Sequence, residues 1–161
     1  MIKVCLADNY PVVHFGIKSY FKDHSDISIA ANVGNFAMVK DILLTKEIDV
    51  LVLDLELEGL SSIFEIKSVL KNFPKTKIIF YSGLSEQIYA PNAIKAGVSG
   101  FVHKTEKLET LGQSIIKVNQ GKIIMNEAVM KNIALIAKQS KSERLYRKLS
   151  NREVEVLRYL S

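Results

Sequence analysis

The fold is decided by a short apolar stretch, DVLVLD, at residues 49–54. Its four central residues are all apolar, with no alternation of polar and apolar positions. Both faces of this strand should therefore be buried, which is typical of a central strand in a parallel sheet with helices on either side. The stretch predicts an α/β fold built around it.

Outward from this stretch, strand patterns and helix patterns alternate five times. Five strand–helix units with right-handed crossovers predict a doubly wound, flavodoxin-like (βα)5 fold, whose five parallel strands have the order 2-1-3-4-5. The expected strands are Ile2–Ala7, Ile27–Val33, Asp49–Asp54, Lys77–Tyr81 and Gly100–His103, and the expected helices are Pro11–Phe21, Phe36–Leu44, Ser62–Asn72, Ser85–Ala96 and Leu108–Asn119.

Several residues mark where the helices should begin and end. Asn35 is placed to cap the second helix, and Ser61 or Ser62 the third. Gly97 is a natural C-terminal cap for the fourth helix. Pro91 lies inside that fourth helix and should break or kink it, so we expect its regular part to start late.

The chain beyond the fifth helix is organised differently. Residues 1–121 form the predicted domain, and residues 122–148 form a linker with a short extended piece at 123–126 and a helix at 127–138. Residues 149–161 begin a new helix, in which Ser150 and Glu153 make a capping box. Because the chain ends before the apolar face of this helix meets a partner, we expect a second domain that is cut short.

Composition indicates a globular protein, with 48% hydrophobic and 24% charged residues. No signal peptide, no membrane span and a single cysteine, Cys5, predict a cytoplasmic protein without an internal disulfide. Most of the net charge of +5 lies near the end: residues 138–161 hold 7 Lys/Arg against 3 Asp/Glu. This basic tail fits either a nucleic-acid contact or a solvated linker.

Polar residues follow four of the predicted strands. Asp8 and Asp54 end the first and third strands, which border the switch point where open parallel sheets bind ligands. Ser82 and Lys104 follow the fourth and fifth strands. Each residue alone is commonly a cap, a turn residue or a solvated side chain, but the four together fit phosphoryl transfer with Mg²⁺.

These motifs resemble the receiver domains of two-component response regulators, specifically those of the NarL/LuxR type. The resemblance runs from Met1 to about Asn126, with a second match at 148–161, where LSNREVEVLR is similar to the start of a LuxR-type helix-turn-helix domain. The motifs that carry it are LADNYP at 6–11, VLDLELEG at 52–59, Ser82, and AGVSGFVHK at 96–104.

The resemblance implies a role for each matching residue. Asp54 would accept a phosphoryl group from a histidine kinase, and Ser82 and Lys104 would contact that group. Phe101 would be the switch aromatic, which turns inward on phosphorylation and changes the face around the fourth helix, the fifth strand and the fifth helix. The receiver would support only its own phosphorylation and dephosphorylation, and would not be a general enzyme.

The resemblance also implies a Mg²⁺ site formed by Asp8, Asn9, Asp54 and the backbone carbonyl of Glu56. The family usually has two adjacent acids after the first strand, whereas Asn9 stands at the second position here. An amide oxygen can coordinate the ion but contributes no negative charge, so Mg²⁺ should bind more weakly.

Alternatives follow from the same residues. A pseudo-receiver, which dimerises and docks independently of phosphate, is favoured by Asn9. An aspartyl-phosphate hydrolase fits less well, because Asp54-Leu55-Glu56 follows the third strand and no second catalytic acid follows. A nucleotide-binding fold lacks its glycine-rich loop. A homodimer is expected; DNA binding is expected of a full-length protein but not of residues 1–161, which lack a recognition helix.

Overall fold

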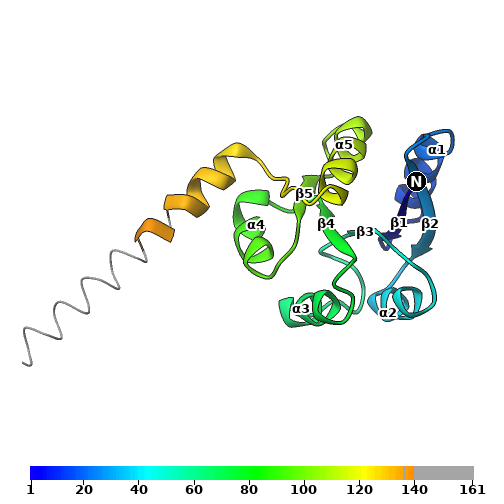
Figure 1. The fold of residues 1–161 in the computed structure, drawn as a ribbon, viewed down its shortest axis with the longest axis horizontal. Helices are drawn as coiled ribbons and strands as arrows, with labels where there is room; N and C mark the ends of the chain where they lie inside the picture. Colours follow the sequence, from blue (N-terminus) through cyan, green and yellow to red (C-terminus); the bar gives the residue numbers. More distant parts are fainter. Residues whose placement is uncertain (136, 140–161) are drawn as a thin grey trace, which may run out of the picture. The chain divides into compact units, whose positions relative to one another are not determined.

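The structure, a computed structural model, describes residues 1–135 and 137–139 of the chain. Its five strands are all parallel and form one sheet in the order β2-β1-β3-β4-β5, which confirms the predicted topology (Figure 1). The elements are β1 (Ile2–Ala7), α1 (Pro11–Phe21), β2 (Ile27–Val33), α2 (Phe36–Thr45), β3 (Val50–Leu53), α3 (Ile63–Asn72), β4 (Lys77–Ser82), α4 (Glu86–Lys95), β5 (Gly100–His103) and α5 (Leu108–Asn119).

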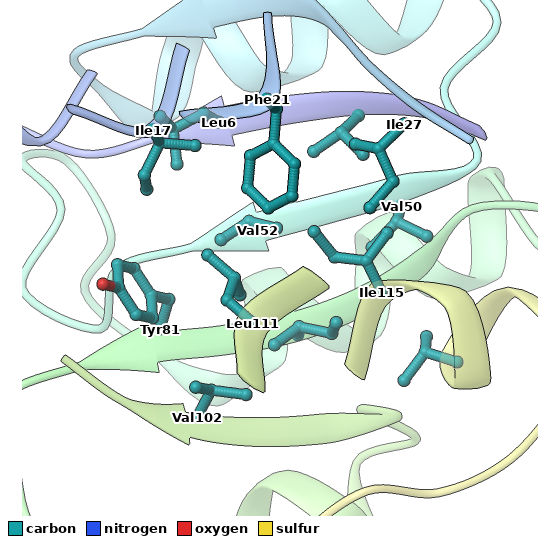
Figure 2. Packing of buried hydrophobic residues seen from close by; sticks show 13 residues of the cluster. Leu6, Ile17, Phe21, Ile27, Val50, Val52, Tyr81, Val102, Leu111 and Ile115 are labelled. Atoms are coloured by element: carbon teal, nitrogen blue, oxygen red, sulfur yellow. The ribbon is translucent and has the colours of Figure 1, made fainter. Parts of the chain in front are cut away.

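Helices cover both faces of the sheet, because alternate strand residues point to opposite sides. On one face, α1 and α5 pack Ile17, Phe21, Leu111 and Ile115 against the central strands (Figure 2). Helices α2 and α3 lie on the other face, and α4 contacts β5 (Figure 1). All four residues of β3 are buried, as the uninterrupted apolar run predicts.

The helix caps follow from local hydrogen bonding. The Asn35 side chain accepts from the Met38 N–H at 3.0 Å. Ser62, rather than Ser61, is the N-cap of α3, where it forms a capping box with Glu65. Gly97 has a φ of 100°, a left-handed conformation that favours glycine after a helix.

The prediction that Pro91 breaks the fourth helix or delays its regular part is wrong. Helix α4 begins at Glu86 and continues through Pro91 to Lys95. Pro91 lies in the second turn, where its missing N–H removes one hydrogen bond, to the Gln87 carbonyl. The loss of one bond near the start of the helix does not delay the start of its regular part.

The expected extended piece at 123–126 contacts the edge of the sheet. The Ile124 N–H donates to the Ser99 carbonyl at 2.8 Å, and the Ile124 carbonyl accepts from Phe101 at 2.9 Å. This short parallel bridge makes the segment an addition to β5. The Asn126 N–H then donates to Glu86 Oε1 at 2.6 Å, which ties the segment to α4 as well.

The compact unit containing the sheet spans Met1–Asn126. Residues 127–135 and 137–139 are helical, in the region predicted as the linker helix. The predicted helix at 149–161 and most of the basic linker lie outside the described residues, and the domain boundaries at 121 and 148 remain predictions. Over the described ranges, no helix combines the length and apolar character that a bilayer crossing requires.

Candidate functional site

Two buried carboxylates lie at the carboxyl edge of the sheet. Ala7 at the end of β1 pairs with Leu53 at the end of β3, so Asp8 and Asp54 follow on adjacent strands. The Asp54 N–H donates to the Ala7 carbonyl at 2.9 Å, which continues the strand pairing into the site. Each aspartate is only 1% exposed. Buried charges require compensation, which a nearby cation supplies.

That cation is Lys104, which follows β5. Its Nζ lies 2.7 Å from Asp8 Oδ2 and 2.9 Å from Asp54 Oδ2. The Tyr10 and Tyr81 rings flank it, with centroids 5.5 and 6.0 Å from Nζ. Burial acts to lower the pKa of Lys104, but attraction to Asp8 and Asp54 outweighs it, so the pKa lies above its usual value.

The pKa of Tyr81, whose ring lies between Lys104 and the buried core, is also shifted. Burial raises the pKa of the Tyr81 hydroxyl, Lys104 acts to lower it, and Asp8 acts to raise it. The net shift of this pKa is upward, so the Tyr81 hydroxyl is neutral near pH 7. It lies beside the ion triad formed by Asp8, Asp54 and Lys104.

The remaining carboxylate oxygens have different partners. Asp8 Oδ1 accepts from the Tyr10 N–H at 2.8 Å, and Asp54 Oδ1 accepts from the Glu56 N–H at 3.1 Å. Asp8 Oδ2 has only its ion pair with Lys104, and no residue in the described part of the chain donates a well-directed hydrogen bond to it. A further ligand at this oxygen would share it with the Lys104 ammonium.

Asn9 spans the two loops that carry the carboxylates. Its Nδ2 donates to the Glu56 carbonyl at 2.8 Å, and its Oδ1 accepts from the Glu58 N–H at 2.8 Å. Both polar atoms of the amide therefore bond to the loop between β3 and α3. The Glu56 carbonyl, an expected metal ligand, faces the Asn9 amide instead.

The predicted Mg²⁺ ligands thus divide into two pairs. Asp8 and Asp54 fit a hard divalent cation, because both are buried carboxylates and Asp8 Oδ2 has Lys104 as its one partner among the described residues. The Glu56 carbonyl accepts from Asn9 Nδ2, and Asn9 Oδ1 accepts from the Glu58 N–H, so an ion that coordinated either oxygen would share it with a hydrogen bond or displace that bond. No cluster of three or more His, Cys, Asp or Glu side chains suited to a metal occurs among residues 1–135 and 137–139.

Ser82 and Phe101 lie on the neighbouring strands. Ser82 is fully buried at the end of β4, and its Oγ accepts from the Leu84 N–H at 3.1 Å. The Lys104 N–H donates to the Ser82 carbonyl at 2.9 Å, which places Ser82 on the same edge as the ion triad. Phe101 is 3% exposed and packs edge-to-face against Phe80, the inward position that the resemblance associates with phosphorylation.

His103 was not identified from the sequence; it forms a hydrogen bond to the loop after β4. Its Nδ1 accepts from the Thr105 N–H at 3.2 Å, so Nε2 carries the proton and donates to the Gly83 carbonyl at 3.0 Å. The signal was the parallel pairing itself, because His103 stands opposite Ser82 in adjacent strands. The ring joins β5 to the loop that begins α4.

Most of this chain matches a known protein family. Residues 4–116, more than half of the chain, match the response regulator receiver domain. The chain belongs to the response regulator receiver family. Receiver domains are signalling domains rather than conventional enzymes, and they generally bind Mg²⁺ for phosphorylation.

The curated relatives of this receiver match nearly the whole chain. It is 30% identical to the Fimbriae Z protein of Salmonella typhimurium over 158 residues, covering 98% of this chain and 75% of that protein. It is 27% identical to the response regulator protein VraR of Staphylococcus aureus over 159 residues, covering 97% and 74%.

Solved structures support the fold. The RcsB response regulator of Salmonella typhimurium superposes with a TM-score of 0.75 at 21% identity, covering 83% of this chain and 70% of RcsB. A LuxR-family response regulator from Aurantimonas superposes with a TM-score of 0.74 at 21% identity, covering 84% and 96%.

Proposed function

We propose that this receiver controls a transcriptional output by accepting a phosphoryl group on Asp54 from a histidine kinase. The observation that carries the proposal is the buried Asp54 carboxylate, which lies at the strand-order switch with Lys104 Nζ 2.9 Å from one oxygen. A carboxylate held beside a fixed cation is suited to attack phosphorus, because the cation offsets the charge of the incoming group.

The chemistry requires one bond to form and one to break. An Asp54 oxygen would bond to phosphorus as the bond from phosphorus to the kinase histidine nitrogen breaks, leaving an acyl phosphate and a neutral imidazole. Lys104 would then contact a phosphoryl oxygen. The Ser82 hydroxyl would turn from the Leu84 N–H to donate to another.

Asp8 and Asp54 would hold Mg²⁺, joined by the Glu56 carbonyl; Asn9, the fourth predicted ligand, bonds to the β3–α3 loop through both polar atoms of its amide instead. When bound, the ion would supply positive charge to the phosphoryl oxygens. The two carboxylates and Lys104 together have a formal charge of −1 (two acids against one base). This small negative charge should attract a divalent cation only weakly.

Intact-mass spectrometry after incubation with acetyl phosphate and Mg²⁺ tests the phosphoacceptor. We expect a phosphate-sized mass gain in the natural protein, its loss in Asp54→Ala, and its retention in Asp41→Ala, where an exposed aspartate of α2 is removed. A gain that survives in Asp54→Ala would contradict the assignment.

A second function is a receiver that docks or dimerises without phosphate. It is favoured by Asn9, whose amide replaces an acid and bonds to the β3–α3 loop. No mass gain at high Mg²⁺, with oligomeric state unchanged by acetyl phosphate, would support this function over the first.

The output is proposed from the relatives. The structures of RcsB, described as interacting with DNA and as bound to a promoter, favour DNA binding by a full-length protein, for which we also propose a homodimer, whereas residues 1–161 alone should show negligible sequence-specific binding. A tight, salt-resistant complex of this chain with one duplex sequence would contradict that expectation.

A further inference from the structure

The Asn9 side chain makes a two-point contact that an acid at this position could not make. The Glu58 N–H can only donate, so the atom facing it must be Oδ1, and the atom facing the Glu56 carbonyl must then be the donor Nδ2. An aspartate here would place an anionic oxygen about as close to the carbonyl oxygen as Nδ2 is now. Those two oxygens would repel unless a cation lay between them.

The clamped loop is the one that begins at Asp54. Asp54 Oδ1 accepts from the Glu56 N–H. Asn9 bonds to the Glu56 carbonyl and to the Glu58 N–H, and we call these two hydrogen bonds the clamp. Leu57, between the two clamped peptides, is 2% exposed, and the Leu57 N–H donates to the Asp54 carbonyl at 3.2 Å. The position of the Asp54 carboxylate is thus coupled to Asn9 through three loop residues.

We propose that Asn9 is a positioning residue that closes the β3–α3 loop over Asp54 by hydrogen bonds, and that its amide competes with a divalent cation for the Glu56 carbonyl. The inference deepens the proposed function and rests on it for the role of Asp54. Asn9 acts here as a substitute for the cation in ordering the loop, and the ion gains the carbonyl only by displacing the amide.

Amide hydrogen exchange of the 161-residue chain tests the clamp in buffer with chelator. The Glu58 amide should exchange slowly in the natural protein and roughly fivefold faster in Asn9→Ala, because one hydrogen bond is lost. Asn72→Ala, which removes an exposed asparagine of α3, should leave Glu58 unchanged. An unprotected Glu58 amide in the natural protein would overturn the clamp without reference to any variant.

Binding of Mn²⁺, which takes the same oxygen ligands as Mg²⁺, tests the competition. Electron paramagnetic resonance of the free ion gives the affinity directly. If Asn9 competes with the ion, Asn9→Ala frees the Glu56 carbonyl and tightens binding by roughly two- to tenfold. If Asn9 were simply a ligand, the same change would weaken binding. Weaker or unchanged binding therefore overturns the proposal.

Asn9→Asp supplies a second variant. Without a cation it should unfold at a lower temperature than the natural protein, since the third acid repels the Glu56 carbonyl, and Mn²⁺ should raise its melting temperature more than that of the natural protein. Equal responses would count against the proposal. None of these measurements uses phosphorylation, so failure of Asp54 to accept phosphate would leave their outcomes unaffected.

Discussion

At the residue scale, the site depends on one cation shared by two buried acids. Lys104 contacts both Asp8 and Asp54, and each acid is 1% exposed. Removing one partner of a buried ion pair leaves an uncompensated charge, which costs more than the pair contributes. Lys104 should therefore matter for folding as well as for phosphate chemistry.

Lys104→Met should lower the free energy of unfolding by about 3 kcal/mol at pH 7, because two buried carboxylates lose their counter-charge. Urea unfolding followed by circular dichroism measures it. Lys75→Met, at an exposed lysine, should change little. Equal stability of the Lys104 variant and the natural protein would show that the acids do not need the ammonium.

The difference in unfolding free energy between the natural protein and Lys104→Met should also depend on pH. The pKa of Lys104 is raised on folding above the ordinary 10.5, so its stabilisation is fully present below pH 10.5 and is lost as pH rises through the folded pKa. The stability difference should be constant from pH 8 to about pH 10 and shrink beyond it.

At the element scale, two serines at helix starts provide a matched pair. Ser62 accepts from the Phe64 N–H at 3.0 Å and forms a capping box, whereas Ser85 at the start of α4 makes no such bond. Ser62→Ala should cost about 1 kcal/mol of unfolding free energy, and Ser85→Ala much less. Equal losses in urea unfolding would show that the cap of α3 contributes nothing specific.

The elements themselves were largely predictable, because each has a local cause. The run DVLVLD required burial on both faces, Asn35 marked a helix start by its side-chain acceptor, and Gly97 marked a helix end by its left-handed backbone. Pro91 misled because one lost hydrogen bond did not outweigh the burial of Ala90 and Ala93 on either side of it, which depends on tertiary packing.

The site was predictable only in part. Asp8, Asp54 and Lys104 each follow a strand of the parallel sheet, so their contact was predictable from the positions of the strand ends. The bonds from Asn9 to Glu56 and Glu58 do not follow, because they depend on the tertiary path of a loop 47 to 49 residues away in sequence.

The added bridge on β5 explains a glycine on the edge of the sheet. A Cβ at Gly100 would lie 3.1 Å from the Ile124 carbonyl oxygen, a backbone atom that cannot move without loosening the bridge. Gly100→Ala should therefore speed hydrogen exchange at the Phe101 and Ile124 amides. Gly83→Ala, where a Cβ meets nothing within 4 Å, should not. Unchanged exchange in Gly100→Ala would show that the bridge tolerates the added methyl group.

At the scale of the whole molecule, the question is where the receiver ends. The sequence pattern places the boundary after residue 121, at the glycine that closes α5, whereas the compact unit extends to Asn126. The five residues between them include Ile124, which bridges β5, and Asn126, whose N–H donates to Glu86 of α4. These contacts hold β5, which carries Phe101, and the start of α4.

Comparing fragments 1–121 and 1–126 decides between the two boundaries. The shorter fragment should be less stable by about 1–3 kcal/mol, because it loses the two Ile124 bridge bonds and the Asn126 bond to a charged group. Thermal and urea unfolding of both fragments, beside the 161-residue chain, measure the difference. If both fragments unfold alike, residues 122–126 belong to the linker. If only 1–126 matches the stability of the longer chain, the segment is part of the receiver, because the bonds of Ile124 and Asn126 to β5 and α4 are then needed for its full stability.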